Sequence, residues 1–342
     1  MVYAGLKSQA IGAMAKLELS IAVGDYDRTR PLLDGSVRID GVKPVLMTLS
    51  PEEIFFRAFR HAEFDICELS LSSFAIKNAQ GDCPYAGVPA FVSRAFRHAA
   101  IYVRKDRIAS PEDLKGGKIG VGEYQLTANV WARALLADDF AISPADVTWV
   151  RGGLEEAGRV EKIPFTLPPS IRLEDAPQSA TLSAMLISGA IDAIISPRVP
   201  SCYARGHADI GRLFDDSTAV AKDWYRRTRI FPIMHMVGIR HRLAEHHPWL
   251  PAAVLKAFSE AKALAHVRLS DTAASHVMLP FLEDQLKEAR ELIGDDYWSY
   301  GLAANERTLA TFLAHHHAQG LSARLLAPRA LFHPSTWESV AV

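Results

Sequence analysis

The chain has 342 residues, 49% hydrophobic and 23% charged, with 38 Lys and Arg against 39 Asp and Glu. It is long enough for two globular domains, and its near-neutral charge without basic or acidic blocks argues against a nucleic-acid or membrane-surface binder. No stretch approaches about 20 uninterrupted apolar residues, so we expect no membrane span. The three cysteines lack CxxC spacing, which predicts free thiols in a reducing compartment, the cytoplasm.

The N-terminal stretch MVYAGLKSQAIGAMAKLELSIAV has no compact apolar segment followed by a cleavage site, so we predict no secretory signal. Apolar residues alternate from Leu17 to Val23, which indicates the first strand. Met14 stands just before this strand, and we interpret residues 1–13 as an N-terminal extension.

Short apolar runs alternate with amphipathic segments along most of the chain. This alternation predicts an α/β architecture with mostly parallel sheets. The last hundred residues are mainly helical in pattern. The predicted strands are LELSIAV (17–23), VKPVLMTL (42–49), FDICEL (64–69), KIGVG (118–122), VTWV (147–150) and IDAIIS (191–196).

Helix boundaries are marked by capping residues. Ser50 is a predicted N-cap, with Pro51 at the first helical position and Glu53 placed to complete a capping box. The sequence SPED at 110–113 repeats this arrangement. Further predicted boundaries are a helix stop near Gly189, a helix start at Pro251, and a helix capped by Asn305 that ends at Gly320.

Residues 151–177 interrupt the alternation with Gly, Pro and charged residues, which predicts a long excursion within a domain. No Walker loop, GxGxxG, GxSxG or HExxH pattern is present, so nucleotide use and the common hydrolase mechanisms have no support. The histidines at 246–247 and 315–317 are adjacent in sequence, and on a helix they point about 100° apart. We interpret them as solvated and predict no metal site.

Polar residues follow two predicted strands at their carboxyl ends, where doubly wound sheets bind ligands. The candidates in the turn GDYDRTRPL after the first strand are Asp25, Tyr26, Asp27 and Arg28, and Glu68 and Ser70 close the third. Solvated turn residues are the alternative interpretation for part of this set.

The stretch GEYQLTANVWARALL predicts a second anion site. A helix that begins near Thr127 presents free N–H groups and the positive end of its dipole, so Thr127, Ala128 and Asn129 are predicted to hold a carboxylate, with Tyr124 in the preceding turn. The alternative is that Thr127 only caps the helix.

Basic residues cluster at the start of FRHAAIYVRKD. Arg97 and His98 precede an apolar run, and Arg94 stands three residues before Arg97. We interpret these residues as the polar start of a strand that faces an anion. Surface charges and a histidine that only satisfies a local hydrogen bond are the alternative.

Several stretches resemble known families. ASPEDLKGGKIGVGEYQLTANVWARALL resembles the segment that opens the second lobe of type 2 periplasmic-binding-protein folds. Six stretches, in order along the chain from about Gly24 to LFHP at Leu331, resemble the 4,5-dihydroxyphthalate decarboxylase family. They are VSRAFRHAAIYV, GEYQLTANVWAR, WVRGGLEEAGR, GAIDAIISPRVP, FPIMHMVGIR and HPWL.

This resemblance implies an α/β fold of two lobes joined by two crossover strands, with a helical C-terminal region and a ligand between the lobes. Lobe I is then discontinuous, at 14–102 and 234–342, and lobe II spans 103–233. The crossovers are expected near 102–104 and 231–236. They should run side by side and bring His98 close to His235.

The resemblance also implies the reaction. The expected enzyme is a carboxy-lyase of phthalate catabolism that converts 4,5-dihydroxyphthalate, a small aromatic dicarboxylate, to 3,4-dihydroxybenzoate and carbon dioxide without a cofactor. The family leaves open whether a divalent metal assists. Alternatives are a non-catalytic binding protein for a small aromatic anion, or another enzyme on this scaffold, such as a cofactor-precursor synthase. A homo-oligomer also stays open.

Roles follow from the chemistry of each side chain. His235 is the expected proton donor, and His98 is expected to orient a carboxylate of the substrate. The reverse assignment of the two histidines stays open. Glu68 or Asp25 is expected to accept a phenolic proton. Arginine, at Arg94 or Arg97, is expected to bind the carboxylate that stays.

Overall fold

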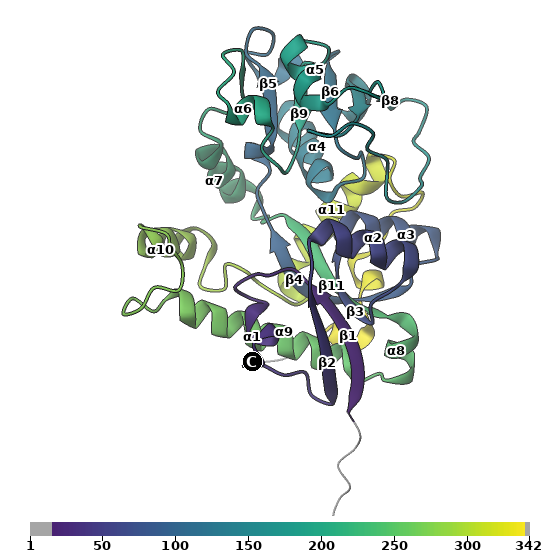
Figure 1. Cartoon of the computed structure of the whole chain (residues 1–342), viewed down its shortest axis with the longest axis vertical. Coiled ribbons are helices and arrows are strands. Elements are labelled where there is room, and N and C mark those ends of the chain that lie inside the picture. The colour runs from purple at the N-terminus through teal and green to yellow at the C-terminus, as the bar shows by residue number, and fades with distance from the viewer. Residues whose placement is uncertain (1–15, 339–342) are drawn as a thin grey trace, which may run out of the picture.

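Two β-sheets, each flanked by helices, form the two lobes of the computed structural model, which describes residues 16–338 (Figure 1). The predicted extension at 1–13 lies outside this range. No helix within the described range is long and apolar enough to cross a membrane. The two-lobed α/β fold predicted from the resemblance is confirmed.

The first sheet has the order β2-β1-β3-β11-β4. Its first three strands are parallel, whereas β11 arrives late in the chain and pairs antiparallel with both β3 and β4. The carboxyl ends of β1 and β3 therefore lie at the same sheet edge as the start of β11. The strands are β1 (Leu17–Val23), β2 (Val42–Thr48), β3 (Ile66–Ser70), β4 (Tyr85–Arg94) and β11 (Ile233–Arg240).

The second sheet has the order β10-β5-β9-β6-β7-β8. Strands β9, β6, β7 and β8 are parallel, and β5 pairs antiparallel with β9 and β10. The strands are β5 (Ile101–Arg104), β6 (Lys118–Val121), β7 (Thr148–Arg151), β8 (Arg172–Asp175), β9 (Ala193–Ile195) and β10 (Ile210–Arg212).

The chain passes between the sheets at 95–100 and again at 229–232, against predicted crossovers near 102–104 and 231–236. The first passage contains a short 3₁₀ turn, η1 (His98–Ala100), so His98 does not begin a strand as predicted. The two passages do run side by side. The Ala95 amide donates to the Pro232 carbonyl at 3.1 Å, and the Phe96 ring stacks on the Phe231 ring with ring centres 4.8 Å apart.

Helices cover both sheets, and α11 lies between the lobes, where it packs on α4 (Figure 1). Helices after first-sheet strands, with those of the C-terminal region, are α1 (Arg30–Leu33), α2 (Pro51–His61), α3 (Leu71–Gln80), α8 (His241–His246), α9 (Leu250–Leu269), α10 (Leu282–Ile293) and α11 (Glu306–Ala318). Those of the second sheet are α4 (Thr127–Phe140), α5 (Leu182–Ser188), α6 (Ser201–Ala204) and α7 (Ser217–Thr228). The other 3₁₀ turns are η2 (Pro111–Leu114), η3 (Pro144–Asp146), η4 (Ala303–Asn305), η5 (Pro328–Leu331) and η6 (Pro334–Thr336).

The predicted helix signals are confirmed at Gly189 and at SPED, where the Asp113 carboxylate accepts the Ser110 amide at 2.8 Å, and they fail in part at Ser50 and Asn305. At Ser50 only half of the capping box forms, because the Glu53 carboxylate bonds to Arg57. The Ser50 side chain accepts the Glu53 amide at 3.4 Å, and Gly189 ends α5 with a left-handed φ of +76°. Asn305 precedes α11, but its side chain does not cap the helix. Its amide instead donates to the Gly301 carbonyl at 2.8 Å.

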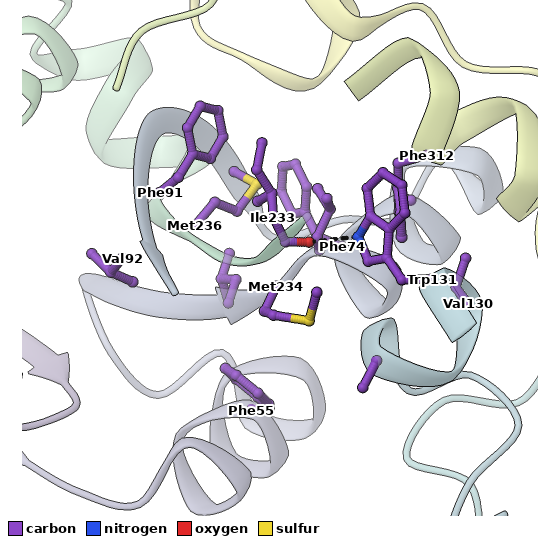
Figure 2. Close-up of a cluster of buried hydrophobic side chains, with 14 of the residues drawn as sticks. Phe55, Phe74, Phe91, Val92, Val130, Trp131, Ile233, Met234, Met236 and Phe312 are labelled. Carbon is purple, nitrogen blue, oxygen red and sulfur yellow. Dashed lines mark hydrogen bonds between the residues drawn. The ribbon is translucent and has the colours of Figure 1, made fainter. Parts of the chain in front are cut away.

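A continuous hydrophobic core joins the lobes (Figure 2). Phe74 and Met236 of the first lobe share it with Trp131 of α4 and Phe312 of α11. The Trp131 indole N–H donates to the Ile233 carbonyl at 2.9 Å, and so ties α4 to the start of β11. The lobes are therefore packed together along α4.

The interpretation of the histidines at 315–317 as solvated is wrong for His316. Its side chain is fully buried, with Nδ1 3.1 Å from the Ser322 hydroxyl and Nε2 3.1 Å from the Ser72 hydroxyl. Burial lowers its pKa to about 3, so it is neutral. The cause is the position of α11 between the lobes, which turns one face of this histidine run inward.

Candidate active site

A glutamate and a histidine meet where two neighbouring strands reach the gap between the lobes. Glu68 lies on β3 and His235 near the start of β11, opposite Ser70 in the antiparallel register. The His235 Nδ1 atom is 2.6 Å from the Glu68 Oε1 atom. This contact fixes the orientation of the imidazole ring, as a carboxylate commonly does for a histidine.

Glu68 is fully buried and receives two further hydrogen bonds. The Tyr26 hydroxyl donates to Oε1 at 2.8 Å, and the Gly24 amide donates to Oε2 at 2.9 Å. Burial alone would raise the pKa of Glu68, but the hydrogen bond and charge of His235, with the Gly24 and Tyr26 donors, lower it. The carboxylate is therefore ionised at neutral pH.

Gly24 is required for this arrangement, because a Cβ at this position would lie 2.5 Å from the Tyr26 ring. Arg28 also contacts the Tyr26 ring. Its guanidinium lies 4.4 Å from the Tyr26 ring centre and 4.3 Å from that of Trp298, and its Nε donates to the Val92 carbonyl at 2.7 Å. Arg28 thus positions Tyr26.

The second nitrogen of His235, Nε2, makes no hydrogen bond within residues 16–338. The side chain is 19% exposed, and the edge of the Phe55 ring packs on it, with ring centres 4.8 Å apart. With Nδ1 bound to Glu68, Nε2 is available to exchange a proton with a ligand in the gap.

Arg97 brings a positive charge to the same region. Its Nε donates to the Met234 sulfur at 3.2 Å, one residue before His235, and no carboxylate in the described part of the chain forms an ion pair with it. Burial lowers its pKa to about 10, so the guanidinium remains charged at neutral pH. A half-buried cation without a protein counter-ion is suited to bind an anion.

Arg94, unlike Arg97, is hydrogen-bonded to several oxygen atoms of the protein. Its guanidinium donates to the Phe231 carbonyl at 2.8 Å, to the Ser299 carbonyl at 2.7 Å and to the Asn305 side chain. The side chain is buried against the C-terminal region, which gives Arg94 a structural role at the junction.

His98 is enclosed by aromatic rings. Its ring centre is 5.7 Å from Trp224, 6.0 Å from Phe214 and 6.3 Å from Phe96, whereas His235 contacts Phe55. Both His98 nitrogens are buried without a hydrogen-bond partner among residues 16–338, and burial lowers the pKa to about 4. The contacts of His98 thus share no residue with those of His235.

Asp25 also lies apart from the Glu68 contacts. Its carboxylate is exposed and accepts a hydrogen bond from Arg30 Nε at 2.8 Å, which lowers its pKa. It therefore resembles the solvated turn residue that the sequence allowed as an alternative.

The start of α4 is docked against the first lobe. The Thr127 hydroxyl lies 2.9 Å from the Ser70 hydroxyl and accepts the Ser72 amide at 3.0 Å. The Asn129 amide, a predicted anion donor, is already bonded to the Leu126 carbonyl at 2.8 Å. Thr127 and Ser70 thus form a contact between the lobes.

Two other residues predicted near this helix end are enclosed by the protein. Tyr124 is fully buried, its hydroxyl donates to the Gln319 carbonyl at 3.2 Å, and Arg133 lies over its ring. Ala128 is buried as well. The prediction for Ala128 concerned its backbone amide, which has no hydrogen-bond partner among residues 16–338.

A cavity of about 470 Å³ lies between the lobes. It is lined by Glu52 of α2 and by the loops that follow β6, β7 and β9, at the carboxyl ends of three parallel strands. His235 is not among its lining residues within the described chain. Glu52 is one helical turn from Phe55, which packs on His235, and the lining residue Leu126 precedes Thr127, which contacts Ser70.

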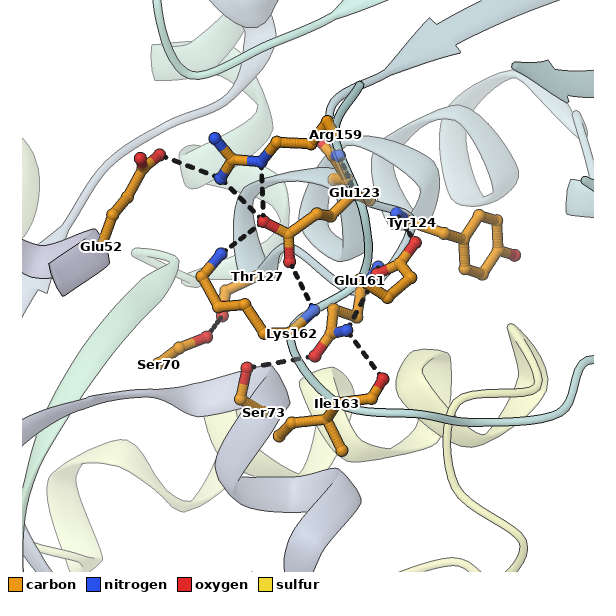
Figure 3. A network of polar contacts seen from close by, with 12 residues as sticks. Glu52, Ser70, Ser73, Glu123, Tyr124, Thr127, Arg159, Glu161, Lys162 and Ile163 are labelled. Atoms are coloured by element: carbon orange, nitrogen blue, oxygen red, sulfur yellow. Dashed lines mark hydrogen bonds and ion pairs between the residues drawn. The ribbon is translucent and has the colours of Figure 1, made fainter. Parts of the chain in front are cut away.

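A polar network borders this cavity (Figure 3). The fully buried Glu123 accepts Arg159 Nη2 at 2.7 Å and pairs with Lys162. Glu52 and Arg198 extend the network across the cavity. Sequence reasoning missed Arg159, Lys162 and Arg198, although Arg198 follows a predicted strand, where the strand-end argument applies.

Comparison with solved structures identifies the class of fold. The periplasmic aliphatic sulphonate binding protein SsuA from Escherichia coli matches with a TM-score of 0.51 and 16% identity, over 95% of each chain. A putative periplasmic sulfonate-binding protein SsuA from Methylobacillus flagellatus KT matches with a TM-score of 0.52 and 16% identity, over 94% of this chain and 93% of that one. The protein has the two-lobed fold of periplasmic binding proteins.

No protein-family model matches the chain. Sequence comparison with curated proteins is specific, however. A 4,5-dihydroxyphthalate decarboxylase from Comamonas testosteroni is 57% identical over 330 residues, which cover 96% of this chain and 100% of that protein. Another from Pseudomonas putida is 60% identical over 214 residues, 62% of this chain and 83% of that protein. The chain belongs to the 4,5-dihydroxyphthalate decarboxylase family.

Proposed function

We propose that the protein is a carboxy-lyase that converts 4,5-dihydroxyphthalate to 3,4-dihydroxybenzoate and carbon dioxide. Family membership gives the substrate class. The structural observation that carries the proposal is the hydrogen bond between His235 and the buried carboxylate of Glu68, which leaves Nε2 available at the gap between the lobes.

The reaction needs a proton at one ring carbon. Each carboxylate of the substrate is para to a hydroxyl, so electron donation from that hydroxyl assists protonation of the carbon that bears the carboxylate. The C–C bond then breaks, its electron pair restores the aromatic ring, and carbon dioxide leaves. The overall step exchanges one carboxylate for one proton, with no change of oxidation state that would need a redox cofactor.

We assign the proton donor to His235 and an orienting role to Glu68. Glu68 is hydrogen-bonded to His235, Tyr26 and Gly24, so we do not assign it as the acceptor of a phenolic proton, which the sequence had suggested. Its carboxylate holds the His235 ring through Nδ1 and leaves Nε2 as the nitrogen that we assign to proton transfer. Arg97 is the residue that we expect to bind the carboxylate retained in the product.

A non-catalytic binding protein for an aromatic anion is the second candidate, because the solved relatives with this fold are named as binding proteins. One experiment separates the two. Purified protein is incubated with 4,5-dihydroxyphthalate while the ultraviolet spectrum and released carbon dioxide are followed. Turnover that scales with protein concentration supports the decarboxylase, and tight binding without release of carbon dioxide contradicts it.

We further propose that the enzyme acts in the cytoplasm, in the breakdown of phthalate. Its three cysteines, Cys67, Cys83 and Cys202, are all free thiols, as is typical of a reducing compartment.

Residues 16–338 contain no cluster of three or more His, Cys, Asp or Glu side chains placed to hold a metal ion.

A further inference from the structure

One carboxylate spans the cavity between two arginines. The Glu52 Oε1 atom is 3.3 Å from Arg159 Nη2, and its Oε2 atom is 3.5 Å from Arg198 Nη2. Glu52 belongs to α2 of the first lobe, whereas both arginines belong to loops of the second. Figure 3 shows the Glu52 carboxylate reaching Arg159 from the opposite side of the gap.

The two arginines differ in how strongly protein contacts fix their guanidinium groups. Arg159 is fixed by Glu123, which is 1% exposed and accepts both Nε at 3.0 Å and Nη2 at 2.7 Å. Arg198 is mostly exposed and forms an ion pair with Glu52. The second lobe thus offers one preoriented guanidinium and one adaptable guanidinium at the same cavity.

Glu52 itself is weakly held. Both of its contacts are longer than the 2.7–2.9 Å of a strong charge-assisted hydrogen bond, and its side chain is 40% exposed. Exposed ion pairs of this kind contribute little to stability. A ligand carboxylate that binds both arginines at optimal distance can therefore displace Glu52 at little cost.

The cavity has the volume of a small-molecule site. Its volume of about 470 Å³ lies within the range of about 300–1,000 Å³ typical of small-molecule sites. Two further acids, Glu155 and Glu156, line it, but the Glu155 carboxylate is occupied by the Ser183 and Ser201 hydroxyls at 2.7 and 2.6 Å.

We propose that Arg159 and Arg198 form a carboxylate subsite that Glu52 fills in the free protein and that one carboxylate of an aromatic dicarboxylate fills in the complex. The inference rests on the proposed function and adds selectivity to it. We place at this subsite the carboxylate that leaves as carbon dioxide, so the product has no carboxylate to bind there. The subsite therefore favours substrate over product.

The test measures binding by calorimetry with phthalate, which lacks the hydroxyls needed for the reaction, and with 3,4-dihydroxybenzoate. Arg198→Ala should weaken phthalate binding about 10-fold or more, the usual effect of losing a charge-assisted contact. Glu52→Gln should tighten it about 3- to 10-fold, because the competing carboxylate is gone. Both variants should bind 3,4-dihydroxybenzoate within about 2-fold of wild type.

Matched controls are Glu53→Gln, one position along α2, and Arg172→Ala, on the β8 strand of the same lobe. Both should leave phthalate binding unchanged. If Glu52→Gln weakens phthalate binding, Glu52 stabilises the contact between the lobes that binding needs, and the proposal is wrong. It is also wrong if Arg198→Ala affects phthalate and 3,4-dihydroxybenzoate equally. These outcomes are independent of turnover, so an inactive wild-type protein that shows the predicted binding would overturn the decarboxylase and leave the subsite standing.

Discussion

His235 and Glu68 are 167 positions apart in sequence, yet the imidazole Nδ1 and the carboxylate Oε1 lie 2.6 Å from each other on adjacent antiparallel strands. The pairing of β11 with β3 creates this contact. It gives a histidine with one nitrogen fixed and the other available, the arrangement that a positioned general acid requires.

His235→Ala should bind phthalate within a few-fold of wild type but lower kcat about 10²–10⁴-fold, because the proton donor is lost while the anion sites remain. Binding is measured by calorimetry and kcat from carbon dioxide release. His241→Ala, at the exposed start of α8, is the control. A kcat near that of wild type in His235→Ala would remove this residue from the mechanism.

Glu68→Gln should lower kcat about 10-fold or more, since the amide keeps the shape but not the charge. It should also change acid stability. The folded-state pKa of Glu68 lies below its usual value of 4.5, so its ionised form stabilises the fold above that pH, and this stabilisation is lost as the pH falls through the lowered pKa.

The difference in unfolding free energy between wild type and Glu68→Gln should therefore shrink from pH 7 to below pH 4, as measured by urea denaturation. Tyr26→Phe removes one donor to the same carboxylate and should cause a smaller loss of kcat. A difference in stability that is constant with pH would contradict the assignment of Glu68 as an ionised, stabilising carboxylate.

Arg97→Ala should raise KM at least 10-fold with little change in kcat, because the retained carboxylate is bound equally in the ground and transition states. Arg94→Ala, three residues away, should instead reduce the unfolding free energy by about 2–4 kcal/mol, since it leaves buried carbonyl groups without donors. Steady-state kinetics and urea denaturation of both variants check this contrast. A raised KM in Arg94→Ala together with a lowered unfolding free energy in Arg97→Ala would instead place Arg94 at the substrate and give Arg97 the structural role.

His98→Phe should keep kcat and KM within about 3-fold of wild type, because His98 lies among aromatic rings and its nitrogens have no partner to lose among the described residues. Its folded pKa is about 4 against an ordinary 6.5, so neutral His98 contributes stability above pH 6.5 that is lost as the pH falls towards 4. Thermal denaturation between pH 7 and 4 should show a weaker pH dependence in the variant. A well-folded variant with turnover reduced 100-fold would place His98 at the substrate.

Much of the fold could be predicted from apolar patterning. The six predicted strands are present, with β1 at Leu17–Val23 as predicted. Strands β8 and β10 were missed because they are short, partly polar and lie at the two edges of the second sheet. Strand β4 was missed because its sequence, YAGVPAFVSR, contains glycine and proline, which normally argue against a strand.

The site was only partly predictable. The strand-end argument located Glu68, but its bond to His235 depends on the register between strands distant in sequence, which no local pattern encodes. The stretch FRHAAIYV has the composition of one strand, yet the η1 turn rotates His98 into the aromatic cluster. Arg159 was missed because it lies in the irregular excursion, whose path is set by contacts such as that with Glu123.

The position of β11 between β3 and β4 also governs how the chain is made. During synthesis, β1 to β4 leave the ribosome first, but the slot in the middle of their sheet stays empty until residues 233–240 have been translated. The second sheet, whose strands all lie between 101 and 212, is complete before then. The edges of β3 and β4 that β11 covers therefore stay unpaired while a whole lobe is synthesised, and unpaired strand edges favour aggregation.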